Sequence, residues 1–227
     1  MTVTADFPRL RIEYPESDGK PMAETDIHIR ELTNTRATLQ DFFRGAPDVY
    51  VSGNLLLYYE EGDPSESIAP DVFVVKGVPK GERRTYKLWV EQRPPVVVFE
   101  FTSRSTRLED TGNKKALYAM LGVNEYFLCD PLVEYLQPPL QGFVLERGEY
   151  RRLPPESDGS LVSQALGLRL KLEGNSLRLI VAVTDERLLT PAEAQEQARA
   201  EHEARRAAEA EVERLKAELA RLRGEQG

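Results

Sequence analysis

Two short hydrophobic runs, each with one carboxylate, place the strongest limits on how this 227-residue chain can fold. They span residues 69–75, with Asp71, and residues 95–103, with Glu100. Both runs are rich in β-branched and aromatic residues and are bounded by proline, glycine or serine, which is typical of short buried strands. An ionised carboxylate is rarely buried unless an ion pair, hydrogen bonds or a metal ion offsets its desolvation. We therefore expect both acids to lie on neighbouring strands of one sheet and to face a common cation.

The segment after the second run reads as a polar loop, a helix and a third strand. We place these elements at residues 103–106, 108–121 and 125–129. Gly122 supports the assignment because glycine commonly follows the last residue of a helix. The chain therefore contains a strand–helix–strand unit directly after Glu100.

The expected helix carries three polar residues on one face. Asp110, Lys114 and Tyr118 recur at intervals of four, and residues with this spacing are neighbours on a helix surface. The strand–helix–strand unit brings this face to one end of the sheet. We expect Lys114 to meet Asp71 and Glu100 there.

Four motifs follow one another along the chain: Pro70-Asp71, Glu100-Phe101-Thr102-Ser103, Asp110-x3-Lys114-x3-Tyr118-x3-Gly122-Val123-x-Glu125-Tyr126 and Asp130-Pro131. In this order and spacing they resemble the motifs of the Uma-two family of restriction-type endonucleases, which belongs to the PD-(D/E)XK nuclease superfamily. The resemblance covers residues 22–189 and implies a mixed α/β (α+β) fold with a restriction-endonuclease-like core, a central mixed sheet and flanking helices.

The resemblance implies Mg²⁺- or Mn²⁺-dependent hydrolysis of phosphodiester bonds in nucleic acid, with DNA as the expected substrate. Asp71 and Glu100 would be catalytic and would bind the metal, together with the main-chain carbonyl of Phe101. Two carboxylates, completed by waters and phosphate oxygens, suit Mg²⁺. The superfamily normally has a lysine two residues after the second acid, where this chain has Thr102. We expect Lys114 to replace that lysine, because a long flexible amine can reach the same point, orient water and stabilise charge.

Two further acids are candidates for the site. Asp110 would assist the metal or hold Lys114, although a simple surface ion pair between the two is the alternative. Folds of this superfamily often take an acid from their first helix, and Glu24, with His28, matches that position in a helix expected over residues 24–43. An exposed polar face is the alternative for both residues.

Several shorter strands complete the expected core. The runs at residues 49–52 and 54–59 should form an antiparallel meander with the Asp71 strand, because sequential strands usually pair when their connection is short. A further short strand is expected at residues 86–90. Beyond Asp130 we expect short strands that form a sheet extension and pack on the core, at residues 142–145, 150–153, 168–172 and 177–181.

The chain divides into an irregular lead-in over residues 1–21, a nuclease domain over 22–189 and a C-terminal helix over 190–227. Thr190 is the expected N-cap and Pro191 the first helical residue. The residues with the a and d spacing of a coiled coil are Val212, Leu215, Leu219 and Leu222. We therefore expect this helix to pair into a homodimer, with a solitary solvated helix as the alternative.

Charge and composition limit the partners and the location. The chain has 38 acidic and 30 basic residues, a net charge of −8, which counts against a broad basic surface for DNA but not against one concentrated patch. No run approaches the ~20 apolar residues of a membrane span, and the N-terminus has no apolar signal core, so we expect a cytoplasmic protein with no membrane partner. A single cysteine excludes an internal disulfide and a multi-thiolate metal site within one chain.

Two other functions are compatible with the sequence. One is a catalytically degenerate nuclease fold that acts as a binding or scaffolding module through its C-terminal coiled coil. The other is a metal-dependent hydrolase of small phosphoesters, which the acidic net charge favours over an enzyme of duplex DNA. Two carboxylates in hydrophobic strands favour an enzyme over a scaffold, because a scaffold gains nothing from keeping them.

Overall fold

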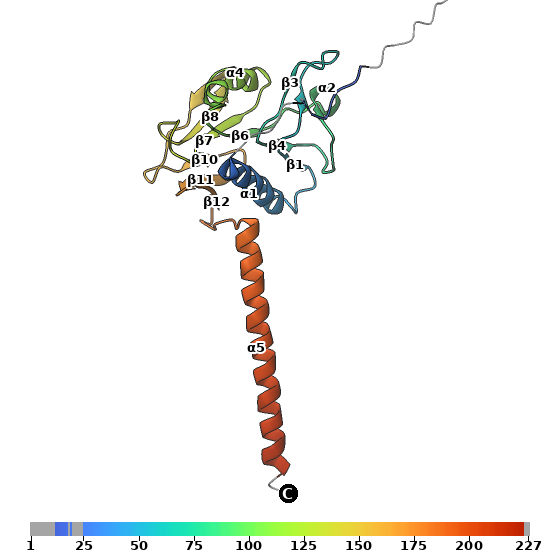
Figure 1. Ribbon diagram of the computed structural model, residues 1–227, viewed down its shortest axis with the longest axis vertical. Coiled ribbons are helices and arrows are strands. Elements are labelled where there is room, and N and C mark those ends of the chain that lie inside the picture. Colours follow the sequence, from blue (N-terminus) through green and yellow to red (C-terminus); the bar gives the residue numbers. More distant parts are fainter. Residues whose placement is uncertain (1–11, 18, 20–24, 225–227) are drawn as a thin grey trace, which may run out of the picture. The chain divides into compact units, whose positions relative to one another are not determined.

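The computed structural model describes residues 12–17, 19 and 25–224 of the chain. The chain divides into two compact units, Met1–Leu188 and Leu189–Gly227. The helices of the first unit are α1 (Asp26–Phe42), α2 (Leu88–Glu91), α3 (Arg107–Thr111) and α4 (Asn113–Met120). Together with the sheets they form a mixed α/β fold, which confirms the class predicted from the sequence (Figure 1).

The central sheet of the described residues is mixed and has the strand order β1-β4-β6-β7-β8-β9. The strands are β1 (Val49–Ser52), β4 (Val72–Lys76), β6 (Val97–Phe101), β7 (Glu125–Cys129), β8 (Leu140–Glu146) and β9 (Glu149–Arg152). β6 is antiparallel to β4 and parallel to β7. The predicted runs around Asp71 and Glu100 are therefore neighbours in the interior of the sheet.

The two faces of the central sheet pack against different helices. Side chains alternate between faces along a strand. Val97, Phe99 and Phe101 of β6 share one buried cluster with Leu39 of α1. The intervening Val98 belongs to a second cluster, which also contains Tyr118 of α4 and the tyrosines of β1 and β7. Glu100 has the same parity as Val98, so it points to the α4 face.

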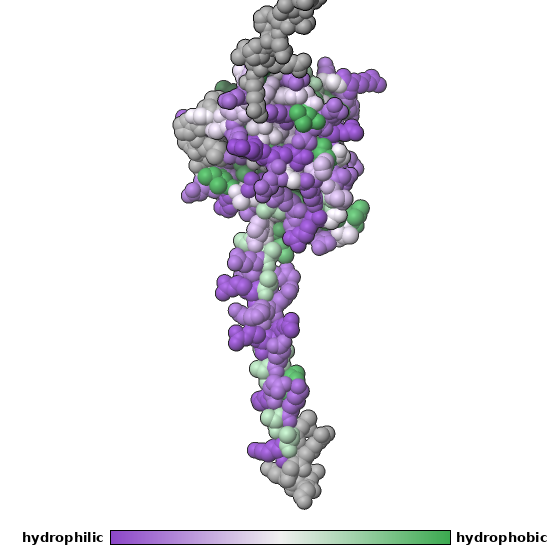
Figure 2. Space-filling view, turned by 90° about the vertical axis from the view of Figure 1, so that its right-hand side faces the viewer, coloured by the Kyte–Doolittle hydropathy of each residue, from purple (hydrophilic) through white to green (hydrophobic). Residues whose placement is uncertain are grey.

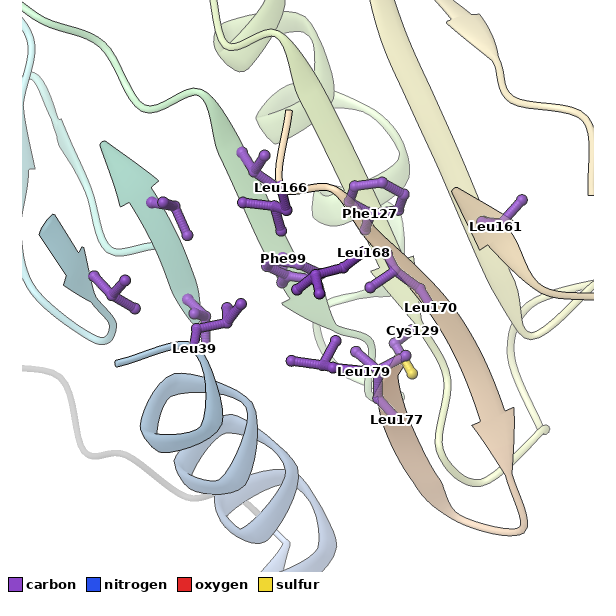
Figure 3. Packing of buried hydrophobic residues seen from close by; sticks show 14 of the residues in the cluster. Leu39, Phe99, Phe127, Cys129, Leu161, Leu166, Leu168, Leu170, Leu177 and Leu179 are labelled. Atoms are coloured by element: carbon purple, nitrogen blue, oxygen red, sulfur yellow. The ribbon is translucent and has the colours of Figure 1, made fainter. Parts of the chain in front are cut away.

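A second sheet covers the face on which α1 packs. Its strands are β10 (Leu161–Ser163), β11 (Leu168–Glu173) and β12 (Ser176–Val181), in that order. Figure 3 shows Leu168, Leu170, Leu177 and Leu179 of this sheet beside Phe99 and Phe127 of the central strands. The strands predicted beyond Asp130 therefore lie in two places: β8 and β9 continue the central sheet, and β11 and β12 pack on the core from a second sheet.

A third, small sheet corrects the predicted meander. Its strands are β3 (Ser67–Ile68), β2 (Leu57–Tyr58) and β5 (Tyr86–Lys87), with β2 in the middle. β1 pairs directly with β4, and β2 leaves the central sheet because the chain turns between them at Asn54, which has a φ of 51°. The strand expected over residues 86–90 is also shorter than predicted, since α2 begins at Leu88.

The helix predicted over residues 108–121 is present in two pieces, α3 and α4, which are separated at Gly112. Its predicted end is correct. The N–H of Val123 donates to the carbonyl of Tyr118, and the N–H of Gly122 donates to that of Ala119, which is the Schellman pattern of helix termination.

The second unit contains the helix α5 (Pro191–Gly224). It begins where the sequence predicts, with a capping box: the Glu193 carboxylate accepts from the N–H of Thr190, and the Thr190 hydroxyl accepts from the N–H of Glu193. Its surface is mostly hydrophilic in Figure 2, with hydrophobic residues among the charged ones. Val212 and Leu215 are 49% and 47% exposed, and the side chains of Leu219 and Leu222 lie outside the described part.

Candidate active site

Asp71 and Glu100 lie on the same side of the central sheet. Val72 of β4 is opposite Phe99 of β6, so the continued register places Asp71 opposite Glu100. Directly opposed residues of antiparallel strands point to the same face. Both acids line a cavity of about 1020 Å³ at this end of the strands.

The Asp71 carboxylate is held at the end of β4 by contacts with two other elements. Its Oδ2 accepts a hydrogen bond of 2.7 Å from the main-chain N–H of Phe101, and it lies 3.3 Å from Nε2 of His28 on α1. His28 is 6% exposed, so it is not part of an exposed polar face. Glu24, the other residue predicted on this helix, lies outside the described residues.

The Phe101 carbonyl points toward the β4 side of β6, as the Phe101 N–H does when it donates to Asp71. The N–H and C=O of one strand residue point to the same side. The continued register places Pro70 opposite Phe101, and proline has no N–H to donate. In the strand pairing of the described residues, the Phe101 carbonyl therefore receives no main-chain hydrogen bond from the opposite strand. It lies beside Asp71.

Glu100 is 1% exposed, and each of its carboxylate oxygens has a partner from α4. Tyr118 donates its hydroxyl to Oε1 at 2.6 Å, and the Nζ of Lys114 lies 2.9 Å from Oε2. Burial raises the pKa of Glu100 well above its usual value; the Lys114 ammonium opposes this shift, and the Asp71 and Asp110 charges add to it. Glu100 therefore binds a proton more readily than an exposed glutamate does, even beside Lys114.

Lys114 lies between two carboxylates, as the helical spacing predicts. Its Nζ is 2.9 Å from Oδ1 of Asp110 as well as from Glu100. Burial alone would lower the pKa of Lys114, but the charges of Glu100, Asp110 and Asp71 raise it above its usual value. The surrounding carboxylates therefore favour the protonated form of Lys114, which suits charge stabilisation.

Asp110 is 1% exposed, so its contact with Lys114 is not a simple surface ion pair. Burial raises the pKa of Asp110, whereas the Lys114 ammonium lowers it. The Tyr126 hydroxyl of β7 donates to the Asp110 carbonyl at 2.9 Å, which fixes α3 against the sheet. The Asp110 carboxylate therefore contacts Lys114 from a helix that is hydrogen-bonded to β7.

Basic residues near the cavity differ in their contacts. Of those described, Arg104 and Lys114 line the cavity. Lys80 binds the carbonyls of Phe43 and Arg44 at the end of α1, and Arg83 binds Glu91. Lys80 and Arg83 therefore bind partners that do not line the cavity.

The sequence reasoning missed the hydrogen bond between Tyr118 and Glu100 and the approach of Gly53 to Asp71. Tyr118 lies one helical turn after Lys114, so their shared spacing was a usable signal. Gly53 packs against the carbonyl of Asp71, and Asn54 donates its N–H to the carbonyl of Pro70 at 2.8 Å. The sequence carried no signal for this contact between separate segments.

The donor groups fit a hard divalent cation. No group of three or more His, Cys, Asp or Glu side chains is arranged to hold a metal in the described part of the chain. The available donors are the carboxylates of Asp71 and Glu100 and the Phe101 carbonyl, all of them oxygens. Mg²⁺ is usually bound by one or two carboxylates plus waters and substrate phosphates, and these donors have the same chemistry.

Comparison with known proteins identifies the family. The family model "Uma2: Putative restriction endonuclease" matches residues 3–179, so the chain belongs to the Uma2 family, which confirms the resemblance of its motifs. A comparison with curated proteins found no match. Among solved structures, the chain is similar to a crystal structure of "a putative nuclease belonging to DUF820" from Anabaena variabilis ATCC 29413, with 15% identity and a TM-score of 0.47 over 65% of this chain and 76% of that chain.

None of the described helices has the length and apolar character that crossing a membrane requires.

Proposed function

We propose that the protein is a metal-dependent endonuclease that hydrolyses phosphodiester bonds of nucleic acid, with DNA as its substrate. The observation that carries this proposal is the contact between Lys114 and Glu100 in the cavity that Asp71 also lines. This contact brings together Asp71 and Glu100, which are suited to binding a metal ion, and the Lys114 ammonium, which is suited to binding a phosphate. DNA is proposed because the family is described as a restriction endonuclease.

Asp71, Glu100 and the Phe101 carbonyl would hold Mg²⁺ or Mn²⁺. A bound divalent cation would acidify a water and neutralise charge that develops on the phosphate. Glu100, Asp110 and Asp71 surround Lys114, and their carboxylates would favour the binding of a second cation beside it. Binding of a cation would also keep Glu100 ionised, against the effect of its burial.

Lys114 would stabilise the negative charge of the reacting phosphate. Its positive charge and its position between Glu100 and Asp110 mean that little reorganisation would be needed during the reaction. Tyr118 would orient the Glu100 carboxylate, and Asp110 would orient Lys114. Both act through another residue and are therefore positioning residues.

The proposed activity is tested by incubating the purified protein with plasmid DNA, linear duplex DNA, single-stranded DNA and RNA. Each reaction contains Mg²⁺, Mn²⁺ or EDTA. We expect new internal ends in DNA with either metal and none with EDTA. Cleavage of RNA alone would contradict the choice of DNA, and cleavage in EDTA would contradict metal dependence.

Mn²⁺ is expected to bind the wild-type protein and raise its melting temperature, because a ligand that binds only the folded state stabilises that state. Asp71→Asn should weaken Mn²⁺ binding about tenfold or more, measured by isothermal titration calorimetry. Asp158→Asn is the matched control, because Asp158 binds Ser160 and Lys171 and does not line the cavity. Equal Mn²⁺ affinity for wild type and Asp71→Asn would contradict the metal-ligand assignment.

We also propose that α5 makes the protein a homodimer. An isolated polar helix is only marginally stable in water, and the exposed Val212 and Leu215 provide an apolar surface for pairing.

Removing the residues after Leu189 should change the mass in light scattering from dimer to monomer while the first unit stays folded. Changing both Val212 and Leu215 to glutamate should have the same effect, whereas Val183→Glu, at a 90% exposed valine outside α5, should not. A dimeric truncated protein would place the interface elsewhere.

A further inference from the structure

Thr102 lines the cavity and carries a buried hydroxyl group. It directly follows β6, and its N–H donates to the carbonyl of Cys129 at 2.7 Å, which fixes its backbone. The residue is 3% exposed, and its Oγ1 forms no hydrogen bond with any described residue. A buried hydroxyl without a partner is unfavourable, so this atom is expected to bind a group that enters the cavity.

Thr102 lies on the same side of the sheet as Glu100. Residues two apart along a strand point to one face and are separated by about 6.6 Å. Both residues line the cavity, together with Asp71 and Lys114. A group bound beside the Glu100 carboxylate is therefore within reach of the Thr102 hydroxyl.

The neighbouring hydroxyl groups differ from Thr102 because they bind one another. Ser103 Oγ lies 3.0 Å from Ser105 Oγ and 3.2 Å from Thr106 Oγ1, and the N–H of Ser103 donates to Thr106 Oγ1. These contacts shape the loop that follows β6. Thr102 Oγ1 takes part in none of them, so the fold of the loop does not depend on it.

A neutral donor suits this position. The Glu100 carboxylate already has one ammonium group, that of Lys114, on Oε2. A second cation at residue 102 would compete with Lys114 for Glu100. A hydroxyl can donate to an anionic oxygen without disturbing the ion pair.

We propose that Thr102 contacts the substrate, and that its hydroxyl donates a hydrogen bond to a non-bridging oxygen of a phosphodiester bound beside Glu100. The inference rests on the proposed function, because it assumes that nucleic acid enters this cavity. The hydroxyl keeps its proton, so it makes no covalent contribution to hydrolysis.

The test compares Thr102→Val, which keeps the shape but removes the hydroxyl, with the wild-type protein. Binding is measured by fluorescence anisotropy of fluorescein-labelled DNA, single-stranded and duplex, in Ca²⁺, which carboxylates also bind. Cleavage is measured in Mn²⁺. We expect Thr102→Val to lower DNA affinity and kcat/KM about 10- to 100-fold, the loss expected for one hydrogen bond to a charged group. Thr102→Ser, which keeps the hydroxyl, should stay within about threefold of wild type.

Thr35→Val is the matched control. Thr35 is 2% exposed, its Oγ1 also forms no hydrogen bond with a described residue, and it does not line the cavity. Both valine variants should melt at or above the wild-type temperature, because each loses a buried hydroxyl without a protein partner. A lower melting temperature for Thr102→Val alone would indicate a structural role and overturn the inference.

The outcomes separate this inference from the proposed function. Wild-type affinity and kcat/KM in Thr102→Val would overturn the inference alone. The wild-type protein could bind DNA without cleaving it, while Thr102→Val binds DNA more weakly. This result would overturn the nuclease function and support the contact between Thr102 and the substrate. No DNA binding by wild type would overturn the inference.

Discussion

Glu100→Gln is expected to reduce metal-dependent cleavage about a thousandfold or more. Glutamine has nearly the same shape and its amide oxygen can still accept from Tyr118, but it has no charge to bind the metal or to pair with Lys114. Metal ions contribute several kcal/mol of transition-state stabilisation, and each 1.36 kcal/mol corresponds to a factor of ten in rate. Initial rates of plasmid cleavage in Mg²⁺ and in Mn²⁺ measure the loss.

Glu125→Gln is the matched control for Glu100→Gln. Glu125 is a buried glutamate of the adjacent strand β7, but it binds the Ser163 hydroxyl and the Ala165 N–H rather than the cavity residues. We expect this variant to lose stability and to retain cleavage at a temperature where it is folded. Equal losses of activity in both variants, or full activity in Glu100→Gln, would contradict the role of Glu100.

The difference in stability between metal-free Glu100→Gln and the wild-type protein should change with pH in a predictable direction. Because burial raises the pKa of Glu100, the folded protein binds a proton more tightly at this site than the unfolded chain does. The stabilisation from the protonated form is therefore complete below the unfolded pKa and is lost as pH rises through the folded pKa. Glutamine does not titrate, so the metal-free variant should gain stability relative to wild type as pH rises over this window, in thermal melts.

The parts of the site that follow from local spacing were predictable. Asp110, Lys114 and Tyr118 are one helical turn apart, so they share a face wherever the helix packs, even though the helix is divided at Gly112. The hydrophobic run around Glu100 identified an interior strand because its composition is typical of burial on both faces. These inferences need no knowledge of distant contacts.

The parts that depend on distant contacts were not predictable. β2 leaves the central sheet through the conformation of Asn54, so the general tendency of sequential strands to pair gave the wrong meander. The burial of His28 depends on how α1 packs beside Asp71, which helical periodicity does not specify. The hydrogen bond from Phe101 to Asp71 likewise needs the register of two strands that are about thirty residues apart.

The close approach of Gly53 to Asp71 leads to the second large expected effect. A Cβ atom added at Gly53 would lie 2.1 Å from the carbonyl oxygen of Asp71 and 3.3 Å from Cα of Val72. Both contacts are with backbone atoms, which cannot rotate away as a side chain can. Gly53→Ala therefore has to displace the backbone at Asp71 or the turn that carries Gly53.

We expect Gly53→Ala to lower cleavage about 100-fold, because a displacement of about 1 Å in a catalytic group has an effect of this size. It should also destabilise the protein by about 1–3 kcal/mol, the usual cost of overpacking, measured by urea unfolding. Gly45→Ala is the matched control, since a Cβ atom there meets nothing within 4 Å. Mn²⁺ titration separates the two effects: at a temperature where both variants are folded, Gly53→Ala should bind Mn²⁺ more weakly than Gly45→Ala. If Gly53→Ala loses stability but keeps wild-type Mn²⁺ affinity and cleavage, Asp71 does not need its observed position to act.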